Sequence, residues 1–396
     1  MMYNFDEIID RQNTDCVKYE RCMELFGTTD LTPLWVADMD FRTPDFIIDA
    51  IRKRLEHPIL GYTMPQKNFA EITRQWISSH HSWNVKCEWL GFLPGIVPGL
   101  AFAVQTYTSA GDEVIVQPPV YYPFFNVVKN NGRTLVYNQL KEENGKFVMN
   151  LADFERKITE RTKLLILCNP HNPGGRVWTR GELLALAEVC KRHDINVISD
   201  EIHADMVLPS SATLHTPFVA INEWTENHTV TFMSPTKVFN MPGLISSCYI
   251  IPNRDLRLQF AHCLEASEMM GGNIFAYIGT AAAYTNGEEW RLQMLAYVQE
   301  NINFLEKFLR KNIPAIAPML PEASFLVWLD CKGLGMDTNE LHRFFSLKAH
   351  LGLNKGTIFG AGGENHLRLN VACPRSVLKQ TLEQLKNAIE QENIPV

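Results

Sequence analysis

The feature of this sequence that most restricts its fold is an alternation of short apolar runs with helical patterns through the middle of the chain. The runs lack polar alternation, which is typical of parallel strands covered by helices on both faces of a sheet. Helices are expected near Tyr121–Asn130 and over Arg180–His193. This pattern predicts an open α/β sheet. The expected strands are Glu113–Val116, Lys163–Leu167, Asn196–Ser199, Thr229–Met233 and Ser246–Ile251.

The last third of the chain predicts a second, smaller α/β domain. Strands are expected at Ser324–Leu329 and His366–Val371, and helices at Glu288–Asn312, Asn339–Leu351 and Arg375–Gln391. We therefore expect three parts: an N-terminal segment that joins the small domain (1–45), a large domain (46–287) and the small domain (288–396).

Composition narrows the class of protein. The 396 residues include 37 Lys and Arg against 44 Asp and Glu, and this acidic balance argues against nucleic acid or an anionic membrane as the main partner. The longest apolar stretch, Leu93–Val104, contains prolines and glycines and is too short to cross a bilayer. The first residues lack an apolar signal core, and nine cysteines without a C-x-x-C pair suit reduced thiols. These features predict a cytoplasmic protein, and the histidine spacing predicts no metal site.

Lys237 is the first candidate for chemistry. It follows the expected strand Thr229–Met233, among the apolar and hydroxyl side chains of Met233-Ser-Pro-Thr-Lys-Val-Phe-Asn240. An amine buried there has a lowered pKa, which makes it a better nucleophile toward an aldehyde. The alternative is a surface lysine in a loop, and a lone lysine would favour that alternative.

Two polar motifs follow other expected strands. Asp200 ends Asn196–Ser199, and open α/β sheets bind ligands at such carboxyl ends. The alternative for Asp200 is an N-cap of a following helix. The loop Asn169-Pro-His-Asn-Pro-Gly-Gly175 follows Lys163–Leu167. Its glycines and prolines alone would indicate a turn, but its two Asn-Pro steps suggest a side-chain amide held in a fixed place.

The segment Leu93–Leu100 is a Gly/Pro turn that opens a helix. Free N–H groups at such a helix start can hold a phosphate. The segment has no Walker lysine, so as a lone phosphate loop it is a weak signal.

Together these motifs resemble the fold-type I pyridoxal-phosphate (PLP) enzymes, the class I/II aminotransferase superfamily. N-P-H-N-P-G, D-E-I-H and S-P-T-K occur in the order typical of that family, and 37 positions separate Asp200 from Lys237. Leu34–Phe41 and Leu367–Arg375 look like the MalY/PatB-type cystathionine β-lyase branch, which consists of carbon–sulfur lyases. The resemblance covers essentially the whole chain. It implies a large PLP-binding domain with a mostly parallel seven-stranded sheet between helices, plus the smaller α/β domain.

The resemblance implies a role for each matching residue. Lys237 forms the Schiff base with PLP and then carries a proton, Asp200 pairs with the pyridine nitrogen, and Asn172 binds the ring 3-oxygen. The other implied cofactor contacts are Tyr121 on the ring face, His203, the N–H groups of Ile96 and Val97, the Ser234 hydroxyl, and Tyr62 entering the neighbouring subunit's site. The implied substrate contacts are Arg368, which clamps the carboxylate with its planar fork, together with Tyr62, Ala37 and Asn172.

The implied function is α,β-elimination from L-cystathionine or related cysteine S-conjugates in a homodimer with shared active sites, giving a thiol, pyruvate and ammonia. An aminotransferase is the alternative, because the same residues serve both reactions. A third hypothesis is a MalY-like regulatory binding protein with a protein partner, which does not exclude an enzyme. Two positions depart from the common aminotransferase pattern: Ile245 stands where many members have a phosphate-binding arginine, and His203 where many have tyrosine. The lyase branch shares both departures.

Overall fold

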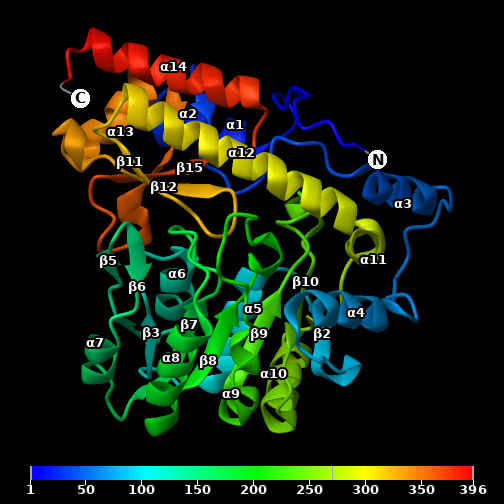
Figure 1. Ribbon diagram of the computed structural model, residues 1–396. Helices are drawn as coiled ribbons and strands as arrows, with labels where there is room; N and C mark the ends of the chain where they lie inside the picture. The colour runs from blue at the N-terminus through cyan, green and yellow to red at the C-terminus, as the bar shows by residue number, and fades with distance from the viewer. Residues whose placement is uncertain (1, 270, 395–396) are drawn as a thin grey trace.

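The computed structural model describes residues 2–269 and 271–394, and a seven-stranded sheet forms the centre of its larger part (Figure 1). Strand β10 is antiparallel to both of its neighbours, and the other pairs are parallel. The prediction of a mostly parallel α/β sheet is confirmed. In spatial order the strands are β2 (Leu90–Leu93), β10 (Ser247–Ile250), β9 (Thr229–Met233), β8 (Asn196–Asp200), β7 (Thr162–Cys168), β3 (Glu113–Val116) and β4 (Thr134–Tyr137).

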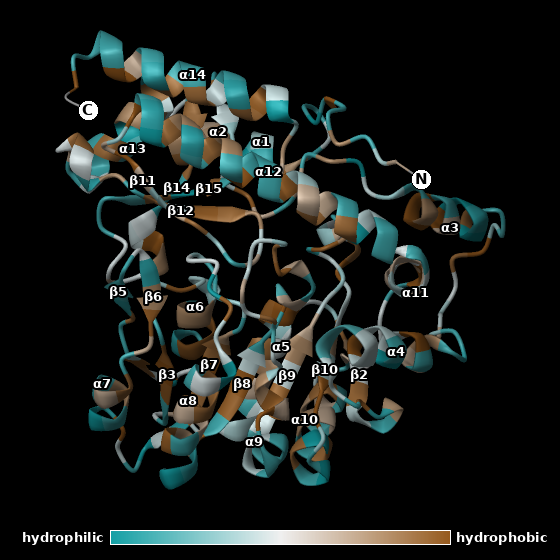
Figure 2. Ribbon diagram, viewed as in Figure 1, coloured by the Kyte–Doolittle hydropathy of each residue, from teal (hydrophilic) through white to brown (hydrophobic). Residues whose placement is uncertain are grey.

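The continuous apolar character of the central strands follows from burial on both faces. In β7, Leu164 and Ile166 pack into one apolar core, whereas Leu165 and Leu167 pack into a second core on the opposite face. Figure 2 shows the central strands in the brown of hydrophobic residues, with teal on the helices around them. The first core includes side chains of α5 (Ile96–Tyr107), α6 (Pro123–Lys129) and α10 (Arg254–Ala266). The second includes side chains of α7 (Leu151–Arg156) and α8 (Arg180–Arg192), with α9 (Glu223–His228) beside them.

The smaller part contains a four-stranded antiparallel sheet, which lies above the large sheet in Figure 1. The helices expected at 288–312 and 375–391 are present with those bounds. The strands are, in spatial order, β11 (Ala317–Met319), β12 (Leu326–Asp330), β15 (His366–Asn370) and β14 (Asn354–Lys355), and the helices are α12 (Glu288–Asn312), α13 (Thr338–Leu347) and α14 (Arg375–Gln391).

Helix α13 is shorter than the sequence predicts. We expected a helix to Leu351, but α13 ends at Leu347, and His350 has a left-handed backbone with φ 53°. The next residues form β13 (Leu351–Gly352), which pairs in parallel with β1 (Thr32–Pro33) near the N-terminus. Apolar periodicity could not reveal the helix end, because Leu351 is buried as well, but in a strand.

The remaining α-helices and a two-stranded hairpin are not part of the two larger sheets. Helices α3 and α11 pack against each other, and both lie at the right of Figure 1. Within the described residues, no helix is both long and apolar enough to cross a membrane. These elements are α1 (Val17–Glu20), α2 (Cys22–Phe26), α3 (Asp45–Leu55), α4 (Phe69–His81), α11 (Ile274–Asn286) and the hairpin of β5 (Lys141–Glu143) and β6 (Lys146–Val148).

Candidate active site

A cavity of about 400 Å³ opens beyond the carboxyl ends of β7, β8 and β9. Parallel strands place the segments that follow them at one edge of the sheet, so motifs far apart in the sequence meet there. Eight predicted residues line the cavity: Ala37, Ile96, Val97, Tyr121, Asn172, Asp200, His203 and Lys237. Ser234, Arg368 and Tyr62 are not among the residues that line it.

Lys237 lies in the turn after β9, with its side chain in the cavity wall. Its Nζ donates a hydrogen bond to the carbonyl oxygen of Ala37 at 2.7 Å. Burial lowers the pKa of the ammonium from its ordinary value of 10.5 to about 8, although the nearby Asp38 carboxylate opposes that shift. The alternative of a freely solvated surface lysine is therefore wrong. An amine in this state is available as a nucleophile and base near neutral pH.

Asp200 is the last residue of β8 and is 4% exposed. Its Oδ1 accepts a hydrogen bond from the N–H of Ile202 at 3.1 Å. Burial raises the pKa of this carboxyl group to about 7. The N-cap alternative is wrong, because the short 3₁₀ helix that follows, Ala204–Met206, begins after His203 instead. A buried carboxyl group that binds protons this strongly can hold a cationic group, such as a protonated ring nitrogen.

Arg368 in β15 is 5% exposed, although an arginine on the polar face of a strand could equally be a solvated surface residue. Its Nη1 donates to Asn172 Oδ1 at 3.1 Å, and its Nη2 donates to the Trp35 carbonyl at 2.9 Å and to Asn354 Oδ1 at 2.8 Å. The guanidinium carbon lies 4.9 Å from the centre of the Phe359 ring. Asn354 and the Trp35 carbonyl are partners that no motif had indicated.

The Arg368 guanidinium is a buried cation that lacks an anionic partner. Among the described residues, no carboxylate oxygen lies within 4.0 Å of it, and its Nε has no hydrogen-bond partner. Burial lowers the pKa of the guanidinium to about 10, which still leaves it charged at neutral pH. Because a buried charge without a counter-ion is costly, this arrangement is suited to an anionic ligand such as a carboxylate.

The start of α5 forms part of the cavity wall. Gly95 precedes the helix with φ 105°, a backbone region that favours glycine, and the first N–H groups of the helix, on Ile96 and Val97, have no intrahelical acceptor. Such groups together with the helix dipole attract a phosphate. Three further residues with hydroxyl groups, Ser246, Ser247 and Thr236, also line the cavity. Their places in the sequence, Thr236 within S-P-T-K and the two serines at the start of the strand expected at Ser246–Ile251, were the available signal.

Ser234 lies behind this wall. It is buried, and its hydroxyl donates to the Ser246 carbonyl at 2.7 Å and lies 2.6 Å from Thr236 Oγ1. The hydroxyl is thus already hydrogen-bonded within the protein, and its predicted contact with phosphate stays a prediction.

Two aromatic side chains also line the cavity, those of His203 and Tyr121. His203 is buried, its Nδ1 has no partner, and burial together with the nearby Lys237 and Arg368 charges lowers its pKa to about 3, so the imidazole is neutral. Burial raises the pKa of the Tyr121 hydroxyl to about 12. The cavity wall therefore contains an acid, a helix start, two aromatic groups and an amine. This donor set, including the orphaned His203 nitrogen, fits PLP.

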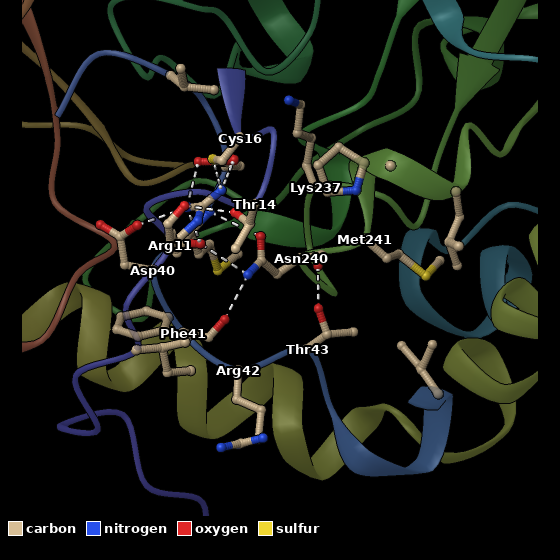
Figure 3. A pocket seen from close by; sticks show the side chains of 18 of the residues that line it. Arg11, Thr14, Cys16, Asp40, Phe41, Arg42, Thr43, Lys237, Asn240 and Met241 are labelled. Atoms are coloured by element: carbon tan, nitrogen blue, oxygen red, sulfur yellow. Dashed lines mark hydrogen bonds and ion pairs between the residues drawn. The ribbon is translucent and has the colours of Figure 1, made fainter. Parts of the chain in front are cut away.

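A second hollow of about 850 Å³ adjoins the cavity at Ala37, Lys237 and Pro242 (Figure 3). Its wall contains an ion-pair network that the sequence did not reveal, in which Arg11 binds Asp38 at 2.6 Å and Asp40 at 2.7 Å. Figure 3 shows Arg11 and Asp40 on one side of Lys237 and Asn240. Asn240 holds this wall in place, since its amide binds the backbone of Met39 and Phe41.

The Tyr62 side chain is fully exposed in the single chain. It lies in the segment between α3 and α4, together with the exposed side chains of Ile59, Leu60 and Met64. This segment runs along the right edge of Figure 1. A role for Tyr62 in a neighbouring subunit stays a prediction. Within the described residues, no group of three or more His, Cys, Asp or Glu side chains is placed to hold a metal ion.

Comparison with known proteins gives consistent matches over the whole chain. The sequence model of the family "Aminotransferase class I and II" matches residues 29–385. Cystathionine β-lyase PatB of Bacillus subtilis is 41% identical, over 98% of this chain and 100% of PatB. The structure of cystalysin from Treponema denticola, which contains a pyridoxal 5′-phosphate cofactor, is 33% identical with a TM-score of 0.95, over 99% of this chain and 100% of cystalysin. The PLP-bound C–S lyase of Staphylococcus hominis in complex with L-cycloserine is 35% identical with a TM-score of 0.90, over 98% of each chain.

Proposed function

The chain belongs to the aminotransferase class I and II family, and we propose that within this family it is a PLP-dependent carbon–sulfur β-lyase that cleaves L-cystathionine and related cysteine S-conjugates. The observation that carries the proposal is that Lys237 lies near a buried acid, Asp200, and near a buried guanidinium without a counter-ion, Arg368. The 41% identity to PatB over its full length favours the lyase branch.

The residues around the cavity have distinct roles toward PLP. Asp200 would hold the ring nitrogen, Asn172 the 3-oxygen, and the N–H groups of Ile96 and Val97 the phosphate. Tyr121 and His203 would lie against the ring. Lys237 would bind the aldehyde carbon until the substrate's amino group replaces it, which frees Lys237 Nζ to act as a base. With Ile245 at the cavity wall in place of a cationic side chain, the phosphate relies on the helix start and on neighbouring hydroxyl groups.

The reaction requires a base at Cα and a fixed substrate. When bound, PLP supplies an electron sink for the electron pair of the broken Cα–H bond. Arg368 binds the α-carboxylate through its guanidinium, whose Nε has no partner within the protein, and this orients the Cα–H bond toward Lys237. Lys237 Nζ, with its pKa near 8, accepts the Cα proton. The Cβ–S bond then breaks, the sulfur leaves with its electron pair and becomes a thiol, and water completes the conversion to pyruvate and ammonia.

The second hollow accommodates the substituent on sulfur. It adjoins Lys237, and its boundary is the segment 36–41, which starts beside the carbonyl that binds Arg368. A substrate held at Arg368 and Lys237 therefore extends its sulfur toward Arg11 and Asp38.

An aminotransferase is the second candidate, because the family includes that reaction and the same residues serve it. The two functions separate in one assay, in which the purified holoenzyme is mixed with L-cystathionine without any keto acid and pyruvate is followed with lactate dehydrogenase. Continuous release of pyruvate and thiol is expected. If conversion of L-cystathionine requires an added keto acid, the lyase proposal is wrong and the protein is an aminotransferase.

The proposal extends to assembly and location. We infer a cytoplasmic homodimer in which the exposed Tyr62 segment of each subunit completes the other subunit's site, because four large apolar side chains on that segment are exposed in the single chain. The three parts 1–45, 46–287 and 288–396 remain our domain proposal, and the β1–β13 pairing supports the union of the first and last. A regulatory protein partner stays a prediction.

A further inference from the structure

Glu201, the residue after Asp200, is a fully buried carboxylate that the reaction does not use. Its Oε1 accepts hydrogen bonds from Ser199 Oγ at 2.7 Å and from the Phe218 N–H at 3.0 Å, and its Oε2 pairs with His215 Nε2 at 2.9 Å. It does not line the cavity that Asp200 and His203 line. Strand geometry explains this separation, because consecutive side chains point to opposite faces.

Its histidine partner supplies a hydrogen bond but no charge. Burial lowers the pKa of His215, and its Nδ1 has no partner, so the neutral ring donates from Nε2. In the part of the chain that the structure describes, His215 is the only Lys, Arg or His side chain with a nitrogen within 4.0 Å of the Glu201 carboxylate. Three donors therefore stabilise the Glu201 anion, and no cation neutralises it.

The groups beyond His215 do not provide that cation either. The His81 ring stands edge-on at 5.2 Å from the His215 ring. His81 Nε2 pairs with Asp205 Oδ1 at 3.0 Å, and the same oxygen accepts the Trp76 Nε1–H at 3.1 Å. Any charge on His81 is thus matched by Asp205, and the negative charge of Glu201 remains.

The peptide unit between the two acids is rigidly held. The Asn169 N–H donates to the Asp200 carbonyl at 2.9 Å, and the Glu201 N–H donates to the Phe232 carbonyl at 2.9 Å. The two carboxylates are therefore joined by a fixed backbone at a buried strand end, where a charge interaction is weakly screened.

We propose that Glu201 is a positioning residue whose fixed negative charge strengthens the hold of Asp200 on the proton of the cofactor's ring nitrogen. This inference rests on the proposed function. Glu201 acts through Asp200 and touches neither cofactor nor substrate. If Glu201 were only structural, it would tie β8 to Phe218, and its substitution would lower the affinity for every cofactor analogue to the same extent.

The experiment compares PLP with 1-deaza-pyridoxal phosphate, which has carbon in place of the ring nitrogen. Dissociation constants of both are measured with the wild-type apoprotein and with the variants Glu201→Gln, Ser199→Ala and Asp200→Asn. Glu201→Gln is expected to raise the dissociation constant of PLP about tenfold, the equivalent of one pKa unit, and that of the deaza analogue less than twofold. Ser199→Ala removes one hydrogen bond but keeps the charge, so any loss should be the same for both ligands.

The Glu201→Gln side chain can be accommodated. Gln Oε1 can still accept from Ser199 and Phe218, and its amide can donate to His215 Nε2 if the ring proton moves to Nδ1, which has no partner to lose. If this variant does not fold, Glu201→Met combined with His215→Leu replaces the buried pair by apolar groups, which proteins often tolerate. The same selective loss of PLP is expected.

The outcomes separate the inference from the function. The role of Glu201 is overturned if the Glu201 variants lose the same affinity for both ligands while Asp200→Asn loses affinity for PLP alone. That result leaves the enzyme proposal intact. If Asp200→Asn also shows no preference, or if wild-type protein does not bind PLP, the proposed function itself fails.

Discussion

The sharpest prediction concerns Arg368. If its guanidinium binds the substrate carboxylate, Arg368→Ala removes one partner of a largely desolvated ion pair. Such a loss costs about 2–5 kcal/mol of binding, so KM for L-cystathionine should rise by about 30-fold to a few thousand-fold. Arg368→Lys should recover only part of this, because an ammonium cannot reproduce two parallel N–H donors.

The contacts of Arg368 show how the effect of its substitution on substrate binding can be separated from the effect on stability. Arg368 donates to Asn172, Asn354 and the Trp35 carbonyl, so truncation leaves those acceptors without a donor and lowers stability by about 1–3 kcal/mol for each one that water does not reach. Asn354→Ala is the matched control, since it removes one of these bonds and keeps the guanidinium. It should lower the unfolding temperature with a much smaller rise in KM.

The assay compares S-benzyl-L-cysteine with its carboxamide, following pyruvate or pyruvamide by chromatography, with PLP content checked by absorbance. The wild type should prefer the carboxylate strongly, and Arg368→Ala should lose most of that preference while PLP stays bound. If Arg368→Ala retains both the wild-type KM and the wild-type preference, the carboxylate binds elsewhere and our assignment of Arg368 is refuted.

Three further predictions address the other groups of the site. Borohydride should fix PLP to Lys237, and Lys237→Ala should abolish pyruvate release; mass mapping of the adduct to another lysine would contradict the whole assignment. Burial raises the pKa of Asp200 from 3.8 to about 7, so the folded apoprotein binds an extra proton between those pH values and loses stability as pH rises through them. The free energy of unfolding of Asp200→Asn apoprotein, measured in urea, should therefore rise relative to that of wild type by up to about 4 kcal/mol between pH 4 and 8. A difference that does not change with pH would argue against the buried acid. Mixing inactive Lys237→Ala with weakened Tyr62→Phe protein should restore activity, because a hybrid dimer has one site with both native residues; no gain after verified subunit exchange would count against shared sites.

Much of the site could be predicted because parallel sheets convert sequence order into spatial proximity. Asn172 and Lys237 each follow a strand with a continuous apolar run, and Asp200 ends another such strand. Neighbouring strands of one direction end at one edge of the sheet. Strands at the sheet margin escaped prediction. β4 is only half-buried, with Thr134 and Tyr137 exposed, so its run is short and partly polar.

The contacts that hold the N-terminal segment could not be predicted from spacing. Lys237 binds the carbonyl of Ala37, and Asn370 binds the carbonyls of Val36 and Asp38. Backbone carbonyls are present at every position, so no residue type marks those that a distant side chain will reach. The Arg11–Asp38 pair has the same origin, since 27 positions separate its members and only the fold brings them together.

For Arg368, strand alternation correctly predicts which side chains share a face, but it would wrongly suggest that this face meets solvent. Period-two alternation in β15 separates Leu367 and Leu369 from Arg368, and the structure keeps that separation: both leucines pack in the core below α12 and α14. A polar face normally implies solvent, yet all five residues of β15 are buried. The face that carries Arg368 is turned toward Phe359 and Asn172, so protein side chains take the place of water there. Strand periodicity reports which side chains share a face, and only the tertiary packing determines what that face meets.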